Sequence, residues 1–243
     1  MAPGGVQSNN PERRNAAREM NDRRSFYDLA YARQNYFSYR PWLYRPYVRA
    51  LMSLSGLGPG CRVLDAGCGQ GFFSSLLAAE GLTVVGADLS VAGIKEARQH
   101  ASRNEHFVVA DLLRLPLTTT FDGVFMRSCS LFNVLDLSET GQVLDAVVRP
   151  LKRDGILLFV YNTNLSRRSN GWANHGMQDF RALLRPIARD LHCYLVNKLD
   201  VYLLGTAAFN ASFTRVNGLL SRRLGRSSEF VGLCRVGQAV GRC

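Results

Sequence analysis

Short apolar stretches alternate with helical repeats along most of the chain from residue 62 onward. Five of these stretches predict buried strands, at 63–64, 83–85, 107–109, 124–126 and 156–160. Between them, apolar residues recur at helical spacing, as at Phe73, Leu76 and Leu77. Strands separated by helices are typical of a parallel sheet that is covered on both faces. The pattern therefore predicts an α/β fold with a doubly wound, mostly parallel sheet.

The last third of the chain is less regular. Residues 180–189 predict a helix that Pro186 bends or restarts, and strand-like stretches follow at 195–204 and 230–236. Between them, leucines at helical spacing indicate an insertion over about 205–227. The uncharged run at 201–214 favours the wall of an apolar pocket. A segment that rests on a membrane surface is the alternative.

The first 58 residues divide into two parts. Residues 1–24 are rich in Asn, Arg, Gly and Pro, which predicts a flexible tail. Residues 25–58 hold nine aromatic residues and predict a helical cap. Most of these rings are expected to pack on the sheet, and some to form a lid that keeps water from a site. Residues 59–243 form the remaining domain.

A glycine-rich turn follows the first predicted strand and opens a helix. It reads Asp65-Ala66-Gly67-Cys68-Gly69-Gln70-Gly71, and glycines let the backbone approach a ligand where a Cβ would clash. Asp88 ends the second strand, where a carboxylate can accept hydrogen bonds from both hydroxyls of a ribose. A dinucleotide site has a glycine at the position of Phe72. The spacing therefore favours a smaller cofactor without phosphates.

These residues resemble the class I S-adenosylmethionine-dependent methyltransferases, in particular the group of quinone-biosynthesis and natural-product enzymes. Residues 63–71 resemble the first motif of that family, 85–90 its ribose motif and 110–112 its adenine-contacting segment. Residues 121–124 and 151–157 resemble its fourth strand and the turn into its fifth. The resemblance covers about 60–161 and implies a Rossmann-like sheet of seven strands, with the last strand antiparallel.

The resemblance also implies that S-adenosylmethionine is the cofactor and S-adenosylhomocysteine the product. By this resemblance, Asp65, Gly67, Gly69 and Gly71 frame the methionine end, and Arg127 lies near the sulfonium. Asp88 holds the ribose, Asp111 and Leu112 flank the adenine, and Leu89 is a further cofactor-binding residue. Many relatives carry a Glu and a His after the fourth strand, where this chain has Ser128 and Phe132. His175, in a polar loop past the fifth strand, is the candidate general base, with an ordinary loop histidine as the alternative.

Composition and charge narrow the class of partner. The chain is 47% hydrophobic and carries six cysteines without C-x-x-C spacing, which favours a folded, reduced, cytoplasmic protein without a metal. No apolar run reaches the ~18 residues of a membrane span. The net charge of +11 lies in the two flanks, and it raises nucleic acid as a partner. The pattern carries no signal for the oligomeric state.

We therefore expect methyl transfer to a small, apolar or aromatic acceptor, with oxygen, nitrogen and carbon all open as the methylated atom. An RNA methyltransferase that uses the basic flanks is the alternative. A nicotinamide-dependent oxidoreductase and a non-catalytic binding protein on the same fold are further hypotheses.

Overall fold

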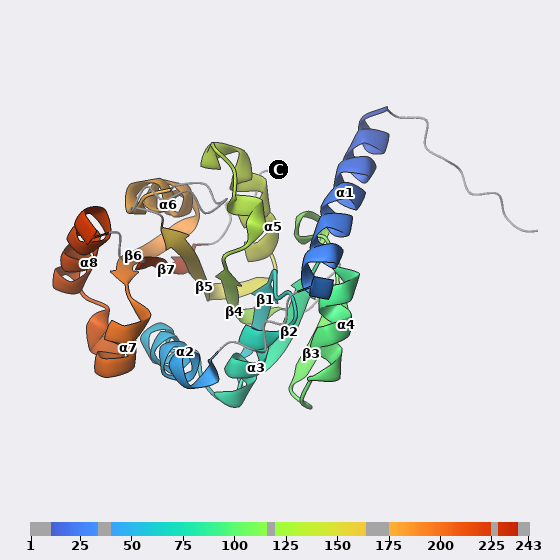
Figure 1. Cartoon of the computed structure of the whole chain (residues 1–243). Coiled ribbons are helices and arrows are strands. Elements are labelled where there is room, and N and C mark those ends of the chain that lie inside the picture. The colour runs from blue at the N-terminus through green and yellow to red at the C-terminus, as the bar shows by residue number, and fades with distance from the viewer. Residues whose placement is uncertain (1–10, 34–39, 116–119, 164–174, 225–227, 238–243) are drawn as a thin grey trace, which may run out of the picture.

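A seven-stranded sheet lies at the centre of the computed structural model, which describes residues 11–33, 40–115, 120–163, 175–224 and 228–237 (Figure 1). The order across the sheet is β3-β2-β1-β4-β5-β7-β6. The strands are β1 (Arg62–Ala66), β2 (Thr83–Asp88), β3 (Glu105–Val109), β4 (Phe121–Arg127), β5 (Leu151–Thr163), β6 (Ala188–Val196) and β7 (Ser228–Val236). Only β7 is antiparallel to its neighbours, β5 and β6. The predicted doubly wound, mostly parallel sheet of seven strands is confirmed.

Helices cover both faces of the sheet. They are α1 (Pro11–Arg33), α2 (Pro41–Ser55), α3 (Phe72–Ala79), α4 (Val91–Gln99), α5 (Gly141–Val148), α6 (Met177–Leu184), α7 (Lys198–Leu204) and α8 (Ala211–Leu224). Successive strand residues face opposite sides, so Val63 and Leu64 join different cores. Buried residues of α2, α3 and α7 pack on one face, and those of α5 and α6 pack on the other (Figure 1). Among the described helices, none has the length and apolar character needed to cross a bilayer.

The last third of the chain differs from its sequence prediction. The stretch 195–204 is not one strand, because β6 ends at Val196 and helix α7 begins at Lys198. The Asn197 side chain accepts a hydrogen bond from the Leu199 N–H at 3.0 Å and caps the new helix. The predicted helix 180–189 ends at Leu184, and Pro186 lies in the short 3-10 helix before β6.

The N-terminal segment is helical where its composition predicts a flexible tail. Helix α1 begins at Pro11 and runs through the boundary predicted at residue 24. Its Ala, Arg, Glu and Met residues favour a helix by intrinsic propensity, even though few residues of the whole helix are apolar. The second helix of the predicted cap, α2, packs into the main core, where Tyr47, Val48 and Leu51 are fully buried.

Candidate active site

One cavity of about 920 Å³ lies along the carboxyl edge of the parallel strands. Ligands of doubly wound sheets bind at this edge, where the strand order reverses, which in this fold is between β1 and β4. Seven of the nine predicted cofactor residues line the cavity: Gly67, Gly69, Asp88, Leu89, Asp111, Leu112 and Arg127. The structure therefore brings together residues that lie up to 60 positions apart in the sequence.

The glycine turn holds its backbone in a conformation that disfavours other residues. Gly69 has φ +55°, and a Cβ there would lie 2.8 Å from the Tyr31 hydroxyl oxygen. Gly71 has φ +82° and begins α3, but it does not line the cavity among the described residues. A Cβ on Gly71 would lie 2.9 Å from Phe107 Cζ, so the missing side chain lets α3 approach β3 closely.

The Asp88 carboxylate is fixed at the end of β2 by two backbone donors. Its Oδ2 accepts from Gly69 N at 2.8 Å and its Oδ1 from Ser90 N at 2.9 Å. Burial raises the pKa of Asp88, and these backbone hydrogen bonds oppose the rise. Each carboxylate oxygen can accept more than one hydrogen bond. Asp88 thus joins the glycine turn to the start of α4 and can still accept from a ligand in the cavity that it lines.

Asp65 lies at the end of β1 but away from the cavity. It is 3% exposed, and its Oδ2 accepts a hydrogen bond from Ser74 Oγ at 2.6 Å. Burial raises the pKa of Asp65 to about 7. These contacts fasten α3 to β1 beneath the glycine turn. The structure does not place Asp65 among the lining residues, and its role at the methionine end stays a prediction.

Helix α1 covers the part of the cavity that contains the glycine turn and Asp88. Tyr27 and Tyr31 line the cavity wall from this helix. Asp28 Oδ1 accepts from Ser90 Oγ at 2.5 Å and from Ala92 N at 3.0 Å, which fixes α1 to the first turn of α4. In Figure 1, α1 and α4 lie side by side. These two rings lie where an aromatic lid is expected from the sequence, and their role in excluding water stays a prediction.

We expect Asp28→Ala to release α1 from α4. Hydrogen bonds to a charged group contribute about 1.5–3 kcal/mol each, so opening of α1 should become at least about tenfold more frequent. Trypsin cleavage at Arg23 and Arg24 should accelerate by the same factor, since it follows the open population. The exposed Asp22 on the same helix gives the control Asp22→Ala, which should leave cleavage unchanged. Equal cleavage of the two variants would show that Asp28 does not hold α1.

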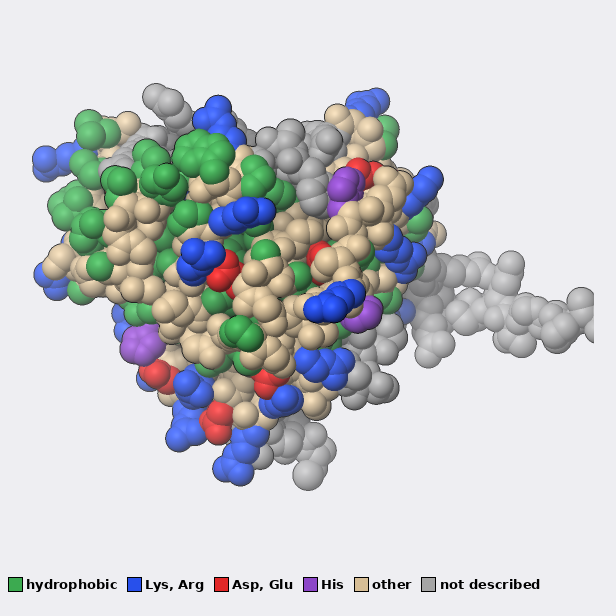
Figure 2. Space-filling view, turned by 90° about the horizontal axis from the view of Figure 1, so that it is seen from below, with side chains coloured by type: hydrophobic (Ala, Val, Ile, Leu, Met, Phe, Trp, Pro, Cys, Tyr) green, Lys and Arg blue, Asp and Glu red, His purple; other side chains and the backbone are tan. Residues whose placement is uncertain are grey.

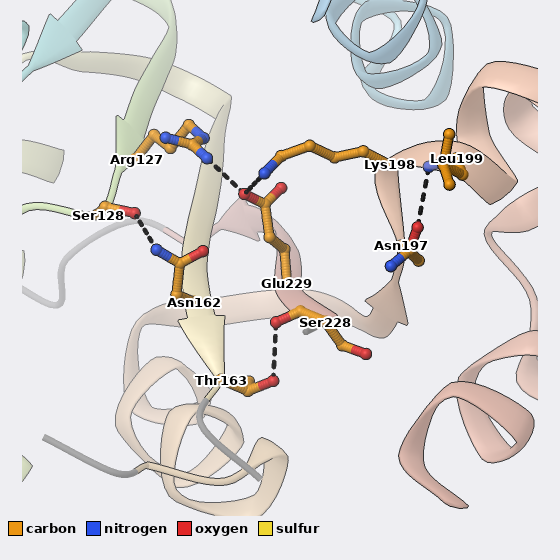
Figure 3. Close-up of polar contacts among 9 residues, drawn as sticks. All are labelled: Arg127, Ser128, Asn162, Thr163, Asn197, Lys198, Leu199, Ser228 and Glu229. Carbon is orange, nitrogen blue, oxygen red and sulfur yellow. Dashed lines mark hydrogen bonds and ion pairs between the residues drawn. The ribbon is translucent and has the colours of Figure 1, made fainter. Parts of the chain in front are cut away.

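Three charged residues meet at the opposite end of the cavity (Figure 3). Arg127 at the end of β4 and Lys198 at the start of α7 point toward the Glu229 carboxylate from opposite sides. Lys198 Nζ lies 3.2 Å from Glu229 Oε1, and Arg127 Nη2 donates to the same oxygen. Burial favours the protonated carboxyl, but the two cations prevail and lower the pKa of Glu229 to about 2. Both cations line the cavity.

Sequence reasoning missed Glu229 and Lys198. Glu229 is one residue before the predicted strand 230–236, and Lys198 is one of only three lysines in the chain. The resemblance implies that the last strand is antiparallel, but no feature of the sequence places the first residues of β7 at the cavity edge. The strand register pairs Glu229 with Asn162 on β5 and with Val196 on β6, and this pairing brings the carboxylate to the cations.

The residues after β4 form the wall of the cavity between the glycine turn and the charged cluster. Ser128 has φ +48°, a conformation that is strained for a residue with a side chain. Asn162 Nδ2 donates to Ser128 Oγ at 3.4 Å, and both residues line the cavity. Cys129 also lines it, but burial raises the pKa of its thiol to about 12. The thiol is therefore neutral, which does not suit a nucleophile.

His175 lies behind this wall. It is 7% exposed, its ring packs against Phe180, and its Nε2 donates to the Val134 carbonyl oxygen at 2.7 Å. Among the described residues, the cavity lining includes Val134 but not His175. The rest of its loop, 164–174, lies outside the described residues. The structure does not bring His175 together with the cofactor residues, and its role as a base stays a prediction.

The insertion after β6 is largely exposed. Leu203 on α7 is 74% exposed and Leu224 on α8 is 72% exposed. Figure 2 shows hydrophobic side chains gathered at one end of the face in view. The exposed large apolar residues of α2, α7 and α8 are Trp42, Leu199, Tyr202, Leu203, Leu204, Val216, Leu219 and Leu224. No described residue of the run 201–214 lines this cavity, and the apolar pocket wall expected from this run stays a prediction. These apolar side chains face outward because one face of each short helix already packs inward.

Comparisons with known proteins agree with this geometry. Residues 64–159 match the family described as a methyltransferase domain. The chain is 30% identical over 142 residues to a ubiquinone biosynthesis O-methyltransferase of Methylocella silvestris, covering 52% of this chain and 54% of that protein. It is 31% identical over 114 residues to a malonyl-[acyl-carrier protein] O-methyltransferase of Serratia marcescens, covering 45% of this chain and 41% of that protein. The matches thus span about half the length of these relatives.

A solved structure has the same fold along nearly the whole chain. Magnesium protoporphyrin IX methyltransferase from Synechocystis, solved with bound S-adenosylmethionine, superimposes with a TM-score of 0.56 and 19% identity, covering 89% of this chain and 97% of that one.

The fold and the cavity define a doubly wound domain with a nucleoside-type cofactor site at the switch point of its sheet. Residues 64–159 match the methyltransferase-domain family and the two relatives are methyltransferases, and the fold is that of the class I S-adenosylmethionine-dependent enzymes.

Proposed function

We propose that this chain transfers the methyl group of S-adenosylmethionine to a small-molecule acceptor. The observation that carries the proposal is the Asp88 carboxylate, held by Gly69 N and Ser90 N within a cavity that the glycine turn also lines. A buried carboxylate at the end of the second strand suits the two hydroxyls of a ribose. Asp111 and Leu112, beyond β3, then flank the base.

The chain contributes positioning rather than covalent chemistry. The bound cofactor supplies an activated methyl group, which moves by in-line displacement to the acceptor. The turn at Gly67 and Gly69 leaves backbone space for the methionine end, and helix α1 excludes water from above. Phe72 lines the cavity beside the turn, and its ring can attract a sulfonium through cation–π contact. The acceptor then occupies the part of the cavity beyond β4.

The relatives support a small acceptor and do not support RNA. Those reported above are named for ubiquinone biosynthesis and for malonyl-[acyl-carrier protein]. The finer choice among oxygen, nitrogen and carbon as the methylated atom is open in this proposal. The nicotinamide hypothesis conflicts with Phe72, which lines the cavity where a dinucleotide site has its third glycine.

Calorimetric titration of the purified chain tests the cofactor assignment. S-adenosylhomocysteine and NADH are titrated in separate experiments. We expect one site for S-adenosylhomocysteine with micromolar affinity and no heat of binding for NADH. Binding of NADH in place of S-adenosylhomocysteine would overturn the proposal.

A further inference from the structure

The acceptor end of the cavity carries an excess of positive charge. Arg127 and Lys198 share the single carboxylate of Glu229, which leaves one net positive charge in the cluster. The Glu229 side chain is 5% exposed, that of Arg127 13% and that of Lys198 27%. Charge that is removed from water to this extent is costly unless it is paired. The cluster therefore lacks one negative charge to balance its two cations.

The hydrogen bonds of the cluster are incomplete as well. Among the described residues, Arg127 Nε is buried and has no hydrogen-bond partner. The rest of the guanidinium lies over the Phe73 ring, with its Cζ 4.5 Å from the ring centroid. Lys198 Nζ lies 5.1 Å from the centroid of the Tyr44 ring. Aromatic faces attract cations but do not neutralise them.

The cluster lies away from Asp88 and Asp111, the residues that suit the ribose and the adenine. Asp88 and Asp111 line the cavity beside β2 and β3, whereas Arg127, Lys198 and Glu229 belong to β4, α7 and the start of β7. The strand order places these two groups on opposite sides of β1. The sulfonium of S-adenosylmethionine carries positive charge, so a cationic cluster does not stabilise it, and we assign Arg127 to the acceptor in place of the sulfonium contact that the resemblance implies. The surplus charge instead suits the other substrate.

We infer that the acceptor is a monoanion, such as an aromatic or aliphatic carboxylate, held by Arg127 and Lys198. This inference rests on the proposed function and names the class of acceptor. A group with one negative charge balances the single surplus positive charge of the cluster. Tyr44 and Phe73, which line the same part of the cavity, provide the surface for the apolar body of the molecule. Ser128 and Asn162 offer further polar contacts beside it.

Two isosteric probes test the inference. We would titrate 2-naphthoate and 2-naphthamide into the full chain, each with and without saturating S-adenosylhomocysteine. They share the same ring system, and only the first is charged. We expect 2-naphthoate to bind at least about tenfold more tightly, because hydrogen bonds to a charged group are stronger than neutral ones. Equal affinity of the two probes would overturn the inference.

Variants of Lys198 test whether this side chain causes the preference for 2-naphthoate. Lys198→Met keeps the length of the side chain and the Arg127–Glu229 pair but removes the surplus charge, so the preference for 2-naphthoate should largely disappear. Lys198→Arg should restore it. Lys95 is exposed on α4 and does not line the cavity, so Lys95→Met should keep the full preference. A preference that survives Lys198→Met would contradict the assignment.

The titration of S-adenosylhomocysteine distinguishes a failure of the proposed function from a failure of the anionic acceptor alone. A chain that binds this product but shows no preference for 2-naphthoate refutes only the anionic acceptor. A chain that fails to bind the product refutes the proposed function, whatever the two probes do.

Discussion

Asp88→Ala is expected to weaken the binding of S-adenosylhomocysteine by about a hundredfold or more. The substitution removes the proposed acceptor of both ribose hydroxyls, and hydrogen bonds to a charged group contribute about 1.5–3 kcal/mol each. It also frees Gly69 N and Ser90 N, which the carboxylate fixes at 2.8 and 2.9 Å. The glycine turn then loses its anchor to α4. The dissociation constant is measured by calorimetry at pH 7.

Two companion variants distinguish loss of the site from loss of the fold. Asp88→Asn keeps the size of the side chain and one acceptor oxygen, and should weaken binding less than Asp88→Ala does. Asp145→Ala, on the exposed side of α5, should bind like the unaltered chain. Melting temperatures show whether each variant is folded. A folded Asp88→Ala variant that binds with unaltered affinity would refute the role of this carboxylate.

Glu229→Gln is expected to lower the free energy of unfolding at pH 7 by about 3–5 kcal/mol. Removal of one member of a buried ion cluster leaves the other charges uncompensated, and such losses are of this size. Arg127 and Lys198 would then face each other without a counter-charge. Urea unfolding followed by tryptophan fluorescence measures the change. A loss below about 1 kcal/mol would show that the cluster is well solvated.

The same residue predicts a dependence on pH. The pKa of Glu229 is about 2 in the fold, below its ordinary value of 4.5, because the two cations outweigh burial. As the pH falls, the unfolded chain takes up this proton first. The stability that Glu229 contributes is therefore complete above pH 4.5 and is lost as the pH falls toward 2. At pH 3 the difference between Glu229→Gln and the unaltered chain should shrink to less than half.

A second substitution checks the cause. Arg127→Met in the Glu229→Gln background removes one of the two uncompensated cations, and should recover part of the lost stability. Arg149, which is exposed after α5, gives the matched control Arg149→Met. If both double variants are equally stable, the loss in Glu229→Gln does not come from unpaired charge.

The cofactor half of the site could be predicted from the sequence because its signals are local. The glycine turn spans seven residues, and Asp88 follows at the end of the next strand. In a parallel sheet the carboxyl ends of these strands meet at one edge, so spacing along the chain implies proximity. The same reasoning expects Asp111 at this edge, and Asp111 lines the cavity.

The acceptor half could not be predicted in the same way. Arg127, Lys198 and Glu229 lie far apart in the sequence, and they meet only because β7 enters antiparallel between β5 and β6. Asp65 and His175 lie near the predicted edge in sequence terms, yet their side chains are buried against Ser74 and the Val134 carbonyl. The direction of a side chain at a strand end depends on packing, which motif spacing does not specify.

Methyl tracing tests the central claim most directly. The purified chain is mixed with methyl-labelled S-adenosylmethionine and an extract of its source cells, and label is counted in the organic-soluble, RNA and protein fractions. The account predicts label in the organic-soluble fraction, on a compound that moves there only after acidification, as a carboxylate does. Asp88→Ala should abolish this labelling. Label in RNA, or no label anywhere, would contradict methyl transfer to a small anionic acceptor.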